Sequence, residues 1–182
     1  MTSSLCVTQA LGHRAVLPAT QSLLAHWTEP AASYDLHRMR LGVAETAAEL
    51  SGELPLECNL EGLQGVSFSK GCYIGQELTS RTHFRGVIRK RIMPVTFASP
   101  AAAAQHVKRG DSVMGADDEA TPAGRVLACH SSGECGLALL RLDSVQKPQR
   151  HRVVSDAGLS VDVVVHTPQW WPQAWQQPGN TR

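Results

Sequence analysis

Cys72 is the residue in this sequence whose neighbours best suit it to chemistry. Gly71 and Gly75 flank it, and glycine lets a backbone approach a ligand closely. Lys70 lies two residues before it, and a helix is predicted to begin near Gly75. A nearby cation and a helix N-terminus both stabilise the thiolate, the form of cysteine that attacks substrates and binds metals. The spacing indicates a reactive nucleophile or a metal ligand; the alternative is an inert cysteine buried in a glycine-rich turn.

The other thiols and histidines give weaker signals. An odd number of cysteines without a C-x-x-C pair argues against a disulfide framework and favours a reducing compartment. The five are Cys6, Cys58, Cys72, Cys129 and Cys135. Cys129, His130 and Cys135 flank a predicted hairpin but lack the short paired spacing of zinc sites. His83, which follows Cys72, is either a second ligand close to that thiol or an exposed histidine.

The charge balance excludes several classes of protein. Seventeen basic and sixteen acidic side chains leave a net charge of +1, whereas a dedicated nucleic-acid binder needs a basic excess. No apolar run approaches the ~20 residues that span a bilayer, so no membrane protein is predicted. The sequence also has no P-loop, dinucleotide fingerprint or Ser-His-Asp arrangement, which removes the common hydrolase, NTPase and Rossmann chemistries.

One segment departs from this balance, because residues 78–110 contain seven basic side chains and no acidic one. Arg89, Lys90 and Arg91 alternate faces if they lie in a strand, so they cannot form a single patch. We therefore predict a solvated strand edge that discourages strand pairing, rather than an RNA-binding site. An acidic partner surface would also suit this segment.

Residues 1–90 are predicted to mix helices with irregular segments. Tyr34, Arg38 and Gly42 are four positions apart, on one side of a helix over residues 31–41 that Gly42 ends. Residues 45–52 are predicted to be a loop, and residues 56–63 an irregular or helical piece. A strand is predicted over residues 7–17. The alternative for the start of the chain, a transit peptide, fits its lack of acids but not its single arginine.

Residues 91–168 are predicted to be a small antiparallel barrel or sandwich. The hairpin turn Ser131-Ser132-Gly133-Glu134 has the required turn chemistry, and residues 99–105 are predicted to be a low-complexity loop. Apolar strand segments recur at 87–97, 110–114, 124–130, 135–143, 153–154 and 159–166. The tail, residues 169–182, holds three of the four tryptophans, which either anchor on the barrel or form a partner surface; we favour anchoring.

The segment around Cys72 also resembles the signature of a known family. The octapeptide KGCYIGQE, which ends at Glu77, is similar to the signature of the YgfZ family, folate-binding relatives of the glycine-cleavage aminomethyltransferase. Its continuation through residues 78–91 resembles the mitochondrial iron–sulfur assembly branch of that family. Supporting similarities lie at residues 11–14, at Tyr34, Arg38 and Gly42, and at residues 55–60 and 168–172. The resemblance extends from residue 8 to residue 172.

The resemblance implies an α+β fold, in which a remnant of an aminomethyltransferase-like folate-binding domain over residues 1–90 precedes a small antiparallel C-terminal β-barrel. It implies a non-enzymatic assembly factor of the mitochondrial matrix that matures [4Fe-4S] client proteins. In the family the cysteine matching Cys72 is the functional thiol, which holds a [2Fe-2S] or [4Fe-4S] cluster transiently with an A-type carrier protein. The residues matching Lys70, Gln76 and Glu77 shape its turn, and the functional motif also includes Gly71, Tyr73 and Gly75.

Tetrahydrofolate is the second ligand that the resemblance implies. Arg38 and Glu57 are its candidate contacts; the alternatives are a surface ion pair for Arg38 and a capping or exposed carboxylate for Glu57. Family members are considerably longer, and this chain resembles their C-terminal part. We therefore expect a folate cavity open on one side and an exposed apolar face. Two alternatives to the assembly role are a tetrahydrofolate-dependent one-carbon transferase and an inactive truncated fragment.

Overall fold

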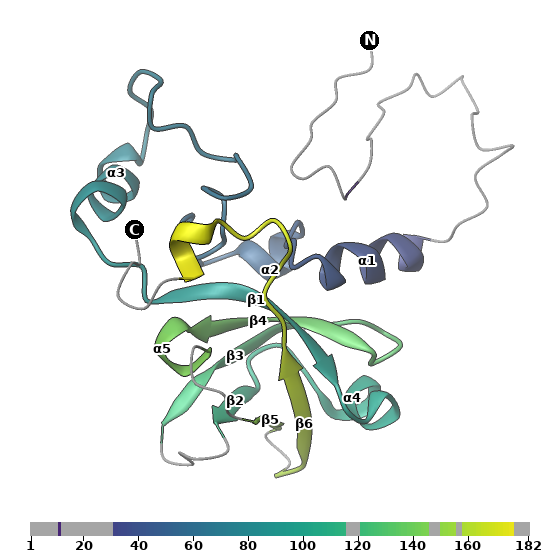
Figure 1. Ribbon diagram of the computed structural model, residues 1–182. Helices are drawn as coiled ribbons and strands as arrows, with labels where there is room; N and C mark the ends of the chain where they lie inside the picture. The colour runs from purple at the N-terminus through teal and green to yellow at the C-terminus, as the bar shows by residue number, and fades with distance from the viewer. Residues whose placement is uncertain (1–10, 12–30, 116–120, 146–149, 156–157, 177–182) are drawn as a thin grey trace, which may run out of the picture.

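Six antiparallel strands close into a barrel in a computed structural model that describes residue 11 and residues 31–115, 121–145, 150–155 and 158–176. The strand order around the barrel is β1-β4-β3-β2-β5-β6, and β6 pairs with β1 to close it (Figure 1). The strands are β1 (Lys90–Phe97), β2 (Ser112–Gly115), β3 (Pro122–Cys129), β4 (Cys135–Arg141), β5 (His151–Val154) and β6 (Ser160–Val165). Of the two folds predicted for residues 91–168, the barrel is therefore confirmed and the sandwich is wrong.

The predicted hairpin between β3 and β4 is confirmed. Gly133 has a φ of +69°, a conformation that L side chains rarely adopt, and its N–H donates to the His130 carbonyl at 2.8 Å. The His130 N–H then donates to the Cys135 carbonyl at 2.9 Å and begins the ladder. The turn chemistry thus fixes the register in which β3 and β4 pair.

β1 is buried on both faces, which gives the molecule two connected apolar layers. Met93 and Val95 point into the barrel core, where they meet side chains of the other strands such as Val113. Ile92, with the opposite parity, packs outside the barrel against Met39 of α1 and Cys58. The helices α1 (Ala31–Arg40) and α2 (Ala47–Leu50) and the turns after them cover this outer face (Figure 1).

The helix predicted over residues 31–41 is confirmed as α1. Gly42 ends it with a φ of +74°, and its N–H donates to the Met39 carbonyl at 2.9 Å. The loop predicted over residues 45–52 is wrong, because α2 lies within it. Thr46 and Glu49 form a capping box there, in which the Thr46 hydroxyl accepts the Glu49 N–H.

The loop predicted over residues 99–105 is also wrong, because α4 (Pro100–His106) occupies it. Proline at the first helical position needs no hydrogen bond for its missing N–H, and the alanines that follow are the strongest helix formers. Low complexity was therefore a helix signal in this segment. The remaining helices are α3 (Gln76–Arg85), α5 (Leu142–Val145) and the 3₁₀ turn η3 (Gln173–Gln176).

The solvated edge predicted for Arg89, Lys90 and Arg91 is wrong in two respects. β1 pairs with β4 on one side and β6 on the other, so it is not an edge strand. Arg91 is completely buried, with its guanidinium carbon 3.2 Å from the centre of the Trp175 ring. Burial lowers the pKa of Arg91 to about 10, so the side chain is still cationic at neutral pH.

The tryptophans of the tail anchor it on the body of the molecule, as expected. Trp171 and Trp175 are buried and join the barrel core, and Trp170 donates its indole N–H to the Leu41 carbonyl at 2.7 Å. The predicted strand over residues 7–17 and the transit peptide lie outside the described residues, apart from Leu11. None of the helices in the described ranges combines the length and apolarity that crossing a bilayer requires.

Candidate functional site

Cys72 lies on an exposed loop that leads into α3, in a lobe that projects from the barrel (Figure 1). Gly75 caps the helix with a φ of +85°, a left-handed conformation that suits glycine. The side-chain oxygen of Gln76 accepts the Tyr73 N–H at 3.2 Å, and the Gln76 N–H donates back to the Tyr73 carbonyl at the same distance. These reciprocal bonds form the turn that presents Cys72 directly before the helix.

The lysine of the motif contacts the tyrosine. The Lys70 ammonium lies 4.7 Å from the centre of the Tyr73 ring, which is a cation–π contact. Gly71 and Glu77 are exposed, as is Cys72 itself, so the alternative of a buried thiol is wrong. The structure thus brings Lys70, Tyr73 and Gln76 into contact around a solvent-facing thiol.

The other described cysteines are in different environments. Cys58 and Cys135 are buried and Cys129 is half-buried. Burial raises the pKa of Cys58 and of Cys129 to about 11, and it raises the pKa of Cys135 as well. These three thiols stay protonated at neutral pH, which leaves Cys72 as the accessible thiol of the described part of the chain.

A chain of contacts that the sequence did not reveal joins this loop to the barrel. Phe68, just before the motif, stacks on His83 of α3 with ring centres 3.6 Å apart and planes 10° apart. His83 Nδ1 lies 3.0 Å from a Glu61 carboxylate oxygen, whose second oxygen lies 3.7 Å from the Arg91 guanidinium. Arg91 in turn packs on Trp175. His83 is therefore neither a lone exposed histidine nor, in this geometry, free to face Cys72.

Within the described residues, no group of three or more His, Cys, Asp or Glu side chains could hold a metal ion. His130 is buried, with Nε2 3.1 Å from the Ala32 carbonyl and Nδ1 2.8 Å from the Ser132 hydroxyl. Both ring nitrogens of His130 thus contact protein groups, so this histidine, next to Cys129, has a structural role. Cys72 can offer one exposed thiol to a metal, and the described residues hold no larger group of ligands that includes it.

Arg38 is buried in an ion-pair network and lies apart from the Cys72 loop. Its two terminal nitrogens donate to the two Glu49 carboxylate oxygens at 2.9 Å each, and Nε donates to Asp35 at 2.8 Å. α1, which carries Arg38, and α3 lie at opposite ends of the layer above the barrel (Figure 1). The guanidinium is thus occupied by protein groups, and its predicted contact with folate stays a prediction.

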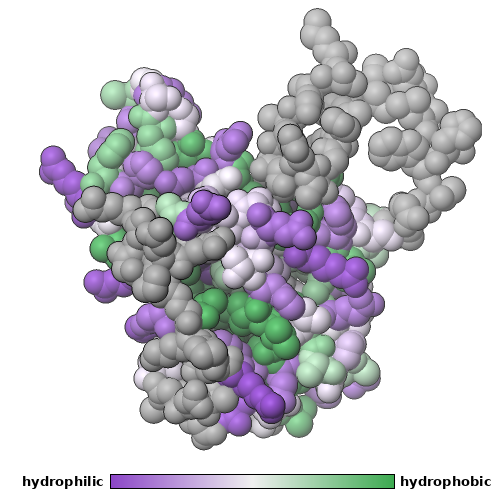
Figure 2. Space-filling view, viewed as in Figure 1, coloured by the Kyte–Doolittle hydropathy of each residue, from purple (hydrophilic) through white to green (hydrophobic). Residues whose placement is uncertain are grey.

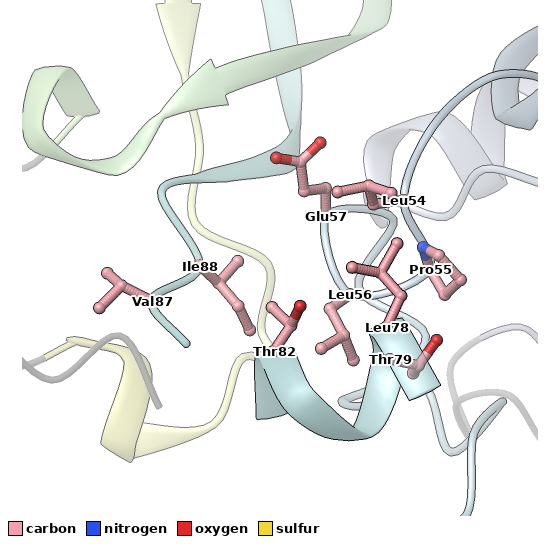
Figure 3. Close-up of a pocket in the computed structure, with 9 residues that line it drawn as sticks. All are labelled: Leu54, Pro55, Leu56, Glu57, Leu78, Thr79, Thr82, Val87 and Ile88. Carbon is pink, nitrogen blue, oxygen red and sulfur yellow. The ribbon is translucent and has the colours of Figure 1, made fainter. Parts of the chain in front are cut away.

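Glu57 lines an apolar pocket of about 200 Å³ beside α3. Figure 3 shows Leu78, Thr79 and Thr82 on the helix, with Ile88 beside Thr82 and Val87 beyond it. The Glu57 carboxylate lies on the side of the pocket where β1 begins. Burial raises the pKa of Glu57, although Lys90 partly opposes this effect. Glu57 is therefore the one carboxylate in a mainly apolar lining that also holds two threonines, and a few polar groups in an apolar lining are the usual composition of a small-molecule pocket.

We predict that Gln76→Ala loosens the Cys72 turn without unfolding the barrel. The substitution removes the acceptor of the Tyr73 N–H and should cost about 1 kcal/mol, the usual net value of a protein hydrogen bond. Hydrogen exchange at the Tyr73 amide should accelerate, while amides of the β3–β4 ladder keep their protection. Glu77→Ala, at the exposed neighbouring position, is the control and should leave the Tyr73 amide unchanged. Equal exchange in both variants would contradict this role for Gln76.

The barrel defines the class to which the chain is related. Residues 89–173 match the family model described as CAF17, C-terminal beta-barrel domain. Full-length curated proteins also match: the human and mouse proteins named "Iron-sulfur cluster assembly factor IBA57, mitochondrial" are 42% and 41% identical over 141 and 143 residues. These alignments cover 76% and 78% of this chain, and 38% of each relative.

A fungal relative extends the match. The protein of Mycosarcoma maydis named "Iron-sulfur cluster assembly factor IBA57 homolog, mitochondrial" is 35% identical over 213 residues, which cover 94% of this chain and 53% of the relative. The chain therefore spans between about two fifths and one half of the length of these relatives. It is a member of the IBA57/YgfZ-like family and matches the C-terminal part of that family, which confirms the resemblance carried by KGCYIGQE.

Proposed function

We propose that this chain acts in the maturation of mitochondrial [4Fe-4S] proteins, with the Cys72 thiolate as a transient iron ligand. The observation that carries the proposal is the exposed Cys72 at the tip of a turn built by the residues of the family motif. The names of the curated relatives, which describe mitochondrial iron–sulfur assembly factors, support both the role and a mitochondrial location, for which we propose the matrix.

A single thiol implies a shared cluster. Iron–sulfur clusters are usually held by four cysteine thiolates, and no group of three or more His, Cys, Asp or Glu side chains in the described residues could complete such a site. The partner is therefore a carrier protein that brings its own thiolates, for which an A-type carrier is our candidate, and the role is not enzymatic. On transfer, the iron–sulfur bond to Cys72 breaks as a client thiolate bonds to the same iron. The client thiol releases a proton, Cys72 regains one, and no iron is oxidised or reduced.

Cluster transfer tests this proposal. The chain, mixed with an A-type carrier loaded with cluster, should accelerate the recovery of activity by apo-aconitase. Cys72→Ser should lose the acceleration and any change that the chain causes in the visible circular dichroism of the cluster. Cys129→Ser, a half-buried thiol, is the matched control and should behave like the wild type. Undiminished acceleration by Cys72→Ser would show that the thiol has no part in transfer.

The Glu57 pocket favours a second candidate function, tetrahydrofolate-dependent one-carbon transfer. An apolar pocket with one carboxylate at its wall suits a flat heterocycle with ring N–H donors. Titration with tetrahydrofolate, followed by an assay for the one-carbon product, separates the two functions. Binding that Glu57→Gln weakens, together with turnover, would favour the transferase; binding without turnover leaves tetrahydrofolate as a ligand of the assembly factor.

A further inference from the structure

Exposed apolar side chains gather between Cys72 and the start of β1. Ile74, two residues after the thiol, is fully exposed, and Leu78 on the first turn of α3 is 53% exposed. Val87 and Leu54, both exposed, line the same pocket as Leu78. Figure 2 shows hydrophobic side chains at the surface of the lobe that carries α3, next to strongly hydrophilic ones. Together with Arg81, Arg85 and Arg89, these four residues form what we call the α3 surface.

The polar part of the α3 surface is cationic. Arg81, Arg85 and Arg89 are exposed, and no salt bridge within the described residues engages them. Arg81 and Arg85 also line a shallow hollow with Phe84, so the charges border apolar groups directly. Residues 78–110 contain no carboxylate, and Glu77, four positions before Arg81 on α3, is one exposed acid against three arginines. An apolar centre with an arginine rim is the usual composition of a protein–protein docking site.

We infer that the α3 surface docks a protein that presents an apolar patch with an acidic rim and cysteine thiolates close to it. The inference rests on the proposed function, since a partner that completes the ligands of a cluster at Cys72 has to cover the neighbouring Ile74 and Leu78. Charge selects this occupant over a second copy of the chain. A two-fold dimer would place the three arginines of one copy against those of the other, and like charges in contact oppose association.

Binding of the A-type carrier, measured by isothermal titration calorimetry with the whole chain, tests the docking surface. Leu78→Ser and the double variant Arg81→Glu/Arg85→Glu should each weaken the carrier's affinity by about tenfold or more, as interface anchors and charge reversals do. Raising the salt concentration should weaken the wild type and have little effect on the double variant. Circular dichroism should show an unchanged fold, since the three side chains are exposed.

Two controls match these variants away from the α3 surface. Leu159→Ser replaces a leucine that is 46% exposed directly before β6, and Lys108→Glu reverses an exposed charge before β2. Both should bind the carrier within about twofold of the wild type, as surface substitutions outside an interface do. Equal binding by all variants, an equal loss in the controls, or no binding by the wild type would overturn the docking surface. Self-association of the wild type that Leu78→Ser abolishes would also overturn it.

The two proposals fail in different ways. If the α3 variants bind the carrier normally while Cys72→Ser fails to transfer cluster, the docking surface is wrong and the function stands. If the α3 variants lose the carrier while Cys72→Ser transfers cluster like the wild type, the surface stands and the role of the thiol is wrong.

Discussion

Arg91→Ala is expected to lower the free energy of unfolding by about 3–5 kcal/mol, the usual cost of removing one partner of a buried ion pair. The Arg91 side chain is completely buried, donates to the Leu56 carbonyl at 3.1 Å and packs on the Trp175 ring. Alanine removes a desolvated cation–π contact and a charged hydrogen bond, and it leaves a cavity beneath the tail. The Glu61 carboxylate also loses its nearest buried cation.

Urea unfolding followed by tryptophan fluorescence measures this loss. The Trp175 emission should change in the folded state, because the cation above its ring is gone. Arg91→Met is the informative control: it keeps most of the volume without the charge, so it separates packing from electrostatics and should lose less than alanine. Lys90→Ala, at the preceding position, should cost under about 1 kcal/mol. A loss below about 1 kcal/mol in Arg91→Ala would contradict the central part that we assign to this side chain.

Arg91, predicted to be solvated and found to be buried, shows which features of the fold could be predicted from the sequence. Its parity with Met93 and Val95 places it on the inner face of β1, and this alternation is visible in the sequence. An arginine at that position favours a solvated edge, because charged side chains are rarely buried. The burial depends on Trp175, far along the chain, which covers the guanidinium. Local pattern therefore predicted the strand, and a long-range contact determined its environment.

In the candidate site, too, local contacts were predictable from the sequence and long-range contacts were not. The turn around Cys72 was predictable because its contacts are local: Gly75 and Gln76 act within four residues of the thiol. The support from Glu61 and Phe68 was missed, since a carboxylate and a ring without periodic spacing carry no local signal. The helix α2, by contrast, was missed although Thr46-x-x-Glu49 is a capping box that could have been recognised.

The Arg38–Glu49 pair is expected to produce the other large effect on stability. Arg38→Ala should cost about 3–5 kcal/mol, because Glu49, with a side chain only 4% exposed, would lose its cation. Arg38→Lys keeps the charge but not the bidentate geometry and should lose less than alanine. Arg141→Ala is a matched control, since its pair with Asp143 is exposed to water, which screens the attraction, and its loss should be much smaller than that of the buried pair. A similar loss in Arg38→Ala and Arg141→Ala would contradict a special part for the buried pair.

This pair also predicts how stability depends on pH. Burial opposes ionisation of Glu49, but hydrogen bonds from Arg38 and from the Glu45 and Thr46 amides prevail and lower the pKa of Glu49 below its ordinary value of 4.5. The folded state therefore binds the proton more weakly than the unfolded chain. The stabilisation is fully present above about pH 4.5 and is lost as the pH falls through the folded pKa. Urea midpoints between pH 6 and pH 3 should fall less steeply in Glu49→Gln than in the wild type, because the glutamine does not titrate. Parallel curves for the two proteins would show that another carboxylate causes the loss of stability at low pH. A flatter curve for Glu49→Gln would assign that loss to the Arg38–Glu49 pair, which joins α1 to α2.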